Sequence, residues 1–101
     1  IPGKDRRPSP ADLVTCLDVL EHVEPDRLYT VLLDLQRCIK KTGLFVIHTG
    51  PAVKVLPGGR NTHLIQKPGD WWIAELGKWF EVKEHMVEDP HLYVIVRKKD
   101  A

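Results

Sequence analysis

The sequence predicts an α/β fold whose elements follow the order β-α-β-α-β-β. Residues 13–17 and 44–48 are short and nearly all apolar, as expected of strands covered on both faces of a parallel sheet. Apolar residues at helical spacing fill the interval between them, which is long enough for a right-handed crossover. Residues 81–87 and 92–96 are predicted to form two closing strands, joined by a hairpin turn at residues 88–91.

The first helix is predicted to begin at Pro25, because proline is favoured at the first position of a helix. Its end is predicted at Gly43, a typical stop residue, with Lys40 and Lys41 placed to complement the helix dipole. The apolar face of this helix comprises Leu28, Val31, Leu32, Leu35 and Ile39.

A second helix is predicted after a long irregular stretch from Gly50 to Gly69, and long loops of this kind often carry function. Asp70 is a suitable N-cap residue, whereas Gly77 weakens the helix by roughly 1 kcal/mol relative to alanine. The apolar face comprises Trp72, Ile73, Leu76, Trp79 and Phe80.

Length and composition indicate a single domain over residues 1–101. The chain has 101 residues, 43% of them hydrophobic, and its 15 basic and 14 acidic residues nearly balance. No basic patch for nucleic acid, membrane span or signal segment is visible, so we expect a cytoplasmic protein without membrane contact. Cys16 and Cys38 lack a metal-binding or redox spacing, and we expect both to be reduced and buried.

The most informative motif is Asp-Val-Leu-Glu-His-Val at residues 18–23, directly after the first predicted strand. Open α/β sheets bind ligands at the carboxyl ends of their strands. Asp18, Glu21 and His22 therefore place two carboxylates and one imidazole where a ligand is expected. His48 ends the second strand at the same edge, where it could line an acceptor pocket or act as a base. The alternative is that His48 has no chemical role and is a histidine whose hydrogen bonds are satisfied at the end of the strand.

This motif, with the order of elements around it, resembles the second half of a class I S-adenosylmethionine-dependent methyltransferase. Residues 12–23 resemble that family's fourth strand and the turn after it, and residues 41–49 resemble the end of the next helix and the fifth strand. The resemblance extends over nearly the whole chain. It implies a truncated Rossmann-like fold whose last strand inserts antiparallel beside the second, and it implies methyl transfer to an unidentified acceptor.

The sequence also departs from the family. The glycine-rich cofactor loop after the family's first strand, and the acidic residue that ends its second strand, have no counterpart here, and Gly58 and Gly59 follow the fifth-strand equivalent instead. We therefore expect a partial domain that lacks the N-terminal half of the fold and is inactive in isolation. The alternative function is a non-catalytic remnant that acts as an interaction or structural module. The free edge of the first strand predicts a homodimer or pairing with another strand.

The resemblance implies roles for individual residues. Leu17 and Asp18 match positions that contact the amino-acid end of S-adenosylmethionine, although Asp18 could instead cap the turn that follows. Asp18, Glu21 and His22 also resemble the divalent-metal site of some members, which a later histidine completes, and His63 is the candidate for that ligand. Such an ion would orient an acceptor hydroxyl and lower its pKa. Many members without a metal carry the same Leu-Glu-His sequence.

Trp71 and Trp72 could stack on a planar acceptor. Trp72 falls on the apolar face of the second helix and is expected in the core, which leaves Trp71 as the acceptor-pocket candidate. No role is expected for His85 and His91, which we place in or beside the closing hairpin, away from the carboxyl edge. Three cations of the long loop are expected on a solvated surface, with contact to an anionic acceptor as the alternative: Lys54, Arg60 and Lys67.

Overall fold

The computed structural model describes residues 9–52 and 55–99 and confirms the predicted α/β class and element order. Two short 3-10 turns, η1 and η2, precede the first helix. No helix within the described ranges is long and apolar enough to cross a membrane. In chain order the elements are β1 (Ala11–Leu17), η1 (Leu20–His22), η2 (Pro25–Arg27), α1 (Leu28–Cys38), β2 (Ile39–His48), α2 (Gly69–Gly77), β3 (Phe80–Glu88) and β4 (His91–Lys98).

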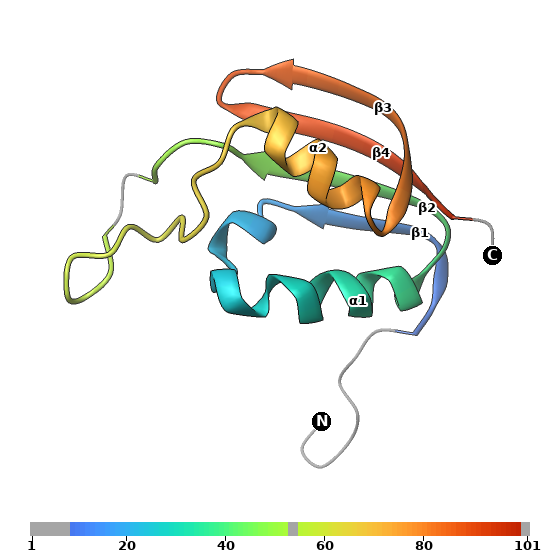
Figure 1. The fold of residues 1–101 in the computed structure, drawn as a ribbon, viewed down its shortest axis with the longest axis horizontal. Coiled ribbons are helices and arrows are strands. Elements are labelled where there is room, and N and C mark those ends of the chain that lie inside the picture. The colour runs from blue at the N-terminus through green and yellow to red at the C-terminus, as the bar shows by residue number, and fades with distance from the viewer. Residues whose placement is uncertain (1–8, 53–54, 100–101) are drawn as a thin grey trace, which may run out of the picture.

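The four strands form one mixed sheet in the order β1-β2-β4-β3 (Figure 1). β1 and β2 are parallel, and α1 is the crossover between them. β4 lies antiparallel between β2 and β3, so the last strand inserts beside the second as predicted. This order leaves β1 at one edge of the described sheet, with neighbours on one side only.

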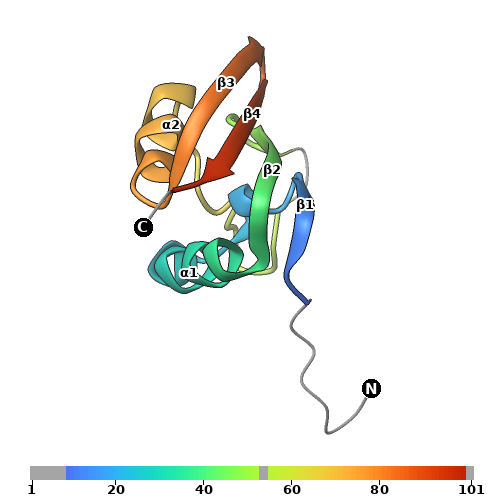
Figure 2. The same cartoon turned by 90° about the vertical axis from the view of Figure 1, so that its right-hand side faces the viewer.

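Both helices cover the same face of the sheet, and the apolar core lies between the two layers (Figure 2). Trp72, Leu76 and Leu32 contribute fully buried side chains from the helices. The sheet contributes every second residue of its central strands, because alternate side chains of a strand point to the same face. These buried sheet residues are Ile39, Phe45 and Ile47 of β2 and Leu92, Val94 and Val96 of β4.

The prediction that β1 is covered on both faces is wrong. Leu13 and Leu17 are 62% and 54% exposed, whereas Cys16 on the opposite face is buried. The reason is that α1 and α2 lie on one side of the sheet, and no described element covers the other side of β1. The apolar residues of β1 therefore form an exposed surface on one face and part of the core on the other.

The predicted end of the first helix is also wrong. The helix ends at Cys38, and Ile39, Lys40 and Lys41 already belong to β2. Gly43 lies within the strand, where an added Cβ would come 2.7 Å from Cδ1 of Ile39 and 3.1 Å from Cγ2 of Val96. Glycine at this position permits close packing inside the sheet and does not end a helix.

The second helix differs from its prediction at both ends. Pro68 occupies the N-cap position and makes no side-chain capping bond, while Asp70 lies in the first turn and its Oδ1 accepts a hydrogen bond from the Trp71 N–H at 3.0 Å. The helix ends at Gly77, so Trp79 follows it and Phe80 begins β3. The closing hairpin of β3 and β4 is confirmed.

Candidate functional site

The carboxyl ends of β1 and β2 lie at the same edge of the sheet, as the parallel register requires. Asp18 leaves β1 with a φ of 54°, a left-handed conformation that aspartate tolerates better than most residues. Its backbone N–H still donates to the carbonyl of Val46 at 2.8 Å. The chain therefore turns sharply at Asp18 and places η1 at the edge where ligands are expected.

Glu21 is the central acidic residue of this edge. Its side chain is 0% exposed, and neither carboxylate oxygen has a hydrogen-bond partner among the described residues. Burying a polar group without a partner costs roughly 1–3 kcal/mol, and more for a charged group. Such a group is uncommon in a folded protein and requires an explanation.

The loop after β2 brings His63 to Glu21. The Ile65 N–H donates to the backbone carbonyl of Glu21 at 3.1 Å, which ties the loop to η1. The Asn61 Oδ1 accepts hydrogen bonds from the Ala52 N–H at 2.8 Å and the His63 N–H at 2.9 Å. The Asn61 Nδ2 donates to the Ala52 carbonyl at 2.9 Å, so one amide side chain fixes the backbone that carries His63.

The two nearest histidines are oriented by backbone carbonyls. The Nδ1 atom of His22 lies 2.9 Å from the carbonyl of Thr62, and that of His63 lies 2.8 Å from the carbonyl of Gly50. A carbonyl oxygen only accepts, so each Nδ1 donates, and in the neutral imidazole the Nε2 atom then carries the lone pair. Metal-binding histidines in proteins are commonly held this way.

Glu21, His22 and His63 form a compact group of possible ligands. One ligand atom from each of the three lies within 4.8 Å of the others. Glu21 and His63 are buried, while His22 is exposed and keeps the group accessible from solvent. Asp18 is exposed and lies outside this group, so the structure brings together three of the four residues named from the sequence.

Four imidazole rings form a continuous row along the carboxyl edge. The ring centroids are 4.7 Å apart for His22 and His63, 4.6 Å for His63 and His48, and 5.0 Å for His48 and His91. The expectation that His91 lies away from this edge is wrong, because the antiparallel register of β2 and β4 pairs His91 with His48. His48 lies at the edge as predicted, with its Nδ1 3.2 Å from the Gly50 carbonyl.

Cys16 is a buried residue of β1 whose thiol interacts electrostatically with Glu21. Burial and, to a smaller extent, the negative charge of Glu21 together raise the pKa of its thiol to about 11. The thiol therefore stays protonated at neutral pH. Cys16 and Cys38 are both buried and form no disulfide, which confirms the prediction for this pair.

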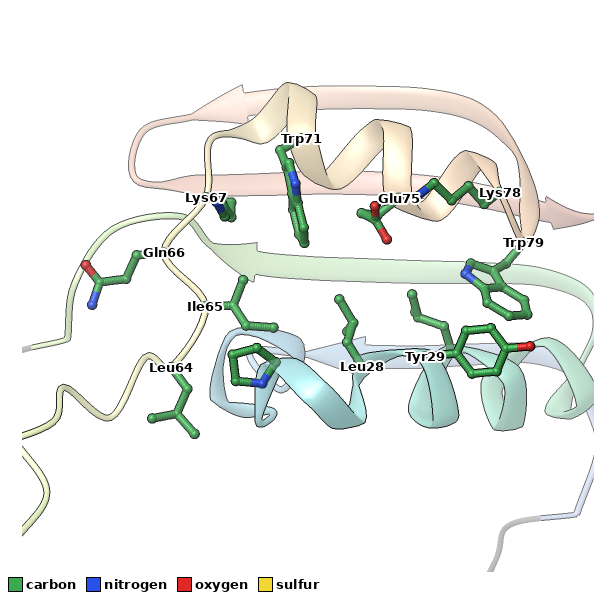
Figure 3. A pocket seen from close by; sticks show the side chains of 12 residues that line it. Leu28, Tyr29, Leu64, Ile65, Gln66, Lys67, Trp71, Glu75, Lys78 and Trp79 are labelled. Carbon is green, nitrogen blue, oxygen red and sulfur yellow. Dashed lines mark hydrogen bonds and ion pairs between the residues drawn. The ribbon is translucent and has the colours of Figure 1, made fainter.

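The remaining candidates are outside the group of Glu21, His22 and His63. Leu17 ends β1 and is 54% exposed. Trp71 is half-buried and lines a cleft between the helices (Figure 3). Of the loop cations, Arg60 binds the carboxylate of Glu24 through two hydrogen bonds of 3.3 and 3.0 Å, and Lys67 lies 5.8 Å from the ring centroid of Trp71. Lys54 is outside the described residues.

Comparison with known proteins identifies the fold. No family model and no curated protein sequence matches the chain. An O-methyltransferase family protein from Burkholderia thailandensis is 16% identical with a TM-score of 0.64, over 89% of this chain and 31% of that one. A DhpI–SAH complex is 21% identical with a TM-score of 0.59, over 86% of this chain and 47% of that one.

A third solved structure is the Burkholderia thailandensis 1,6-didemethyltoxoflavin-N1-methyltransferase with bound 1,6-didemethyltoxoflavin and S-adenosylhomocysteine. It is 22% identical with a TM-score of 0.58, over 85% of this chain and 44% of that one. The chain thus spans less than half the length of each of these neighbours. The similarity shows that the chain shares the fold of the matching part of these methyltransferase structures.

Proposed function

We propose that this chain is the acceptor-side half of an S-adenosylmethionine-dependent methyltransferase that uses a divalent cation. The observation that carries the proposal is the convergence of Glu21, His22 and His63 at the carboxyl edge of a methyltransferase fold. This edge is where open α/β sheets bind their ligands. Leu17 and Asp18, at the end of β1, are proposed to contact the amino-acid end of the cofactor.

The three side chains fit a divalent cation chemically. A carboxylate and two imidazoles are the donor types that Mn²⁺, Fe²⁺, Co²⁺ and Zn²⁺ accept. A bound cation would give the buried Glu21 carboxylate the partner that no described residue supplies. The carbonyls that hold His22 and His63 already present Nε2 of each ring for binding.

When bound, such a cation supplies Lewis-acid chemistry that lowers the pKa of an acceptor hydroxyl. The protein's own residues have three further tasks. Asn61 positions the backbone of His63, and the Gly50 carbonyl fixes its ring. His48 lies next to His63 in the row of rings and is proposed to line the acceptor pocket, where it can accept the acceptor proton. The transfer itself then depends mainly on positioning.

Calorimetry with MnCl₂ tests the metal-binding part of this proposal. We expect saturable binding near one ion per chain, lost in His22→Ala and in His63→Ala. His85→Ala is the matched control, because His85 is exposed on β3 and lies outside the group. His22 is exposed, so its variant keeps the core intact. Unchanged binding in both site variants would contradict the assignment.

Titration with S-adenosylhomocysteine in saturating MnCl₂ tests the methyl-transfer part. Saturable binding supports a cofactor site within this chain. The second candidate function, a non-catalytic interaction module, is favoured by the open edge of β1, where no described strand pairs on the outer side. Absence of binding together with self-association would support that module.

A further inference from the structure

A cleft of about 490 Å³ lies between α1 and α2, on the helix-covered side of the molecule (Figure 3). This volume falls in the range of small-molecule sites, roughly 300–1,000 Å³. The cleft is separate from the histidine row, although Ile65 lines it and also binds the backbone of Glu21. None of the residues proposed to bind the cation or the cofactor lines it.

One wall of the cleft lies on α2 and the turn after it, and the other lies on α1. Trp71, Glu75 and Trp79 follow one another at intervals of four residues along α2 and the turn after it, so they share one face. Leu28 and Tyr29 face them from α1. The rings of Tyr29 and Trp79 meet edge to face at a centroid distance of 5.0 Å and close one end, while Trp71 forms the other end.

The charges around the cleft are unevenly distributed. At the centre, the Glu75 carboxylate is paired with the Lys78 ammonium at 2.7 Å, so this pair is neutral. Lys67 stands 5.8 Å from the centroid of Trp71 and has no ion pair with any residue in the described ranges. The Trp71 end therefore combines a half-buried indole with one positive charge that no described residue pairs.

We propose that this cleft binds a small planar aromatic molecule that carries one negative charge. Its ring system would stack on the Trp71 indole, because aromatic rings prefer offset or edge contacts with other rings. The rest of the ring system would fill the apolar space over Leu28 and Ile65. Its anionic group would pair with Lys67. This site goes beyond methyl transfer and does not depend on the cation or the cofactor.

Calorimetric titration of the chain with 2-naphthoate, and with its neutral analogue 2-naphthamide, tests the proposal. We expect saturable binding of 2-naphthoate with a dissociation constant of about 1 mM or tighter. The neutral analogue should bind about two- to fivefold more weakly, which is the range that one exposed ion pair provides. No saturable binding of 2-naphthoate would overturn the proposal.

Two variants separate the two parts of the site. Lys67→Met keeps the apolar stem and should equalise the two probes, while Trp71→Leu should weaken both by about tenfold. Lys40→Met is the matched control, because Lys40 is an exposed lysine of β2 that does not line the cleft. Equal loss in Lys40→Met and Lys67→Met, or full binding in Trp71→Leu, would overturn the assignment. None of these outcomes bears on cation binding at Glu21.

Discussion

Glu21→Gln is expected to stabilise the metal-free protein, because the native side chain is buried without a partner. Both carboxylate oxygens are inaccessible and lack hydrogen bonds among the described residues. A buried unpaired polar group costs roughly 1–3 kcal/mol, and a charged group costs more than a neutral one. Glutamine keeps the volume and removes the charge, so we expect a gain of at least about 1 kcal/mol. In a domain of this size that gain raises Tm by about 4–8 °C.

A saturating cation should reverse this order of stabilities. A ligand at one hundred times its Kd stabilises the native state by about 2.7 kcal/mol, and the substitution removes one of the three proposed ligands. Urea unfolding with EDTA and with MnCl₂ measures both effects. Glu84→Gln is the control, since Glu84 is an exposed carboxylate of β3 and should change neither curve. A Glu21→Gln protein less stable than wild type in EDTA would show that the buried Glu21 carboxylate does not destabilise the metal-free protein.

Three other properties can be checked directly. In the urea assay, Gly43→Ala should lower the unfolding free energy by about 1–3 kcal/mol, because the added Cβ would meet the buried Ile39 and Val96. Gly77→Ala should raise it by roughly 0.4–1 kcal/mol, because the space around Gly77 is open. The Cys16 pKa rises from 9.0 to about 11, so the unfolded chain loses this proton first and stability should fall as pH rises from about 9 to about 11. Cys16→Ala should lack this part of the pH dependence, and identical wild-type and variant profiles would contradict it. The open edge of β1 should pair with a second copy, so light scattering should give the mass of a dimer and Thr15→Pro, whose N–H faces away from β2, a monomer, while a wild-type monomer would disprove the pairing.

The sequence was sufficient for the elements whose signals are local. The apolar runs gave the strands, and the motif at residues 18–23 located the carboxyl edge. Gly43 was misassigned because its role depends on Val96, which is brought opposite only by the pairing of β2 with β4. The same non-local register carries His91 to His48. Helical spacing alone could not reveal either pairing, since strand register is fixed by tertiary contacts.

Asn61 was missed for a related reason. Its three hydrogen bonds join backbone groups of Ala52 and His63, and these groups come close to Asn61 only in the folded loop. An asparagine two residues before a histidine is nevertheless a usable signal, because asparagine side chains commonly bond to backbone two residues further on. Asp18 was grouped with Glu21 by sequence proximity. The turn at its positive φ separates the two within the structure.

Paramagnetic NMR of the histidine ring protons during titration with MnCl₂ shows directly whether a cation binds at Glu21, His22 and His63. A cation held by Glu21, His22 and His63 should broaden the signals of His22 and His63 at the lowest additions, since both rings belong to the proposed ligand group. His85 is exposed on β3 and provides the internal reference. Early loss of the His22 and His63 signals and of that of the adjacent His48, while the His85 signal persists, is the predicted result. Equal broadening of all histidines, His85 included, would contradict the proposed site.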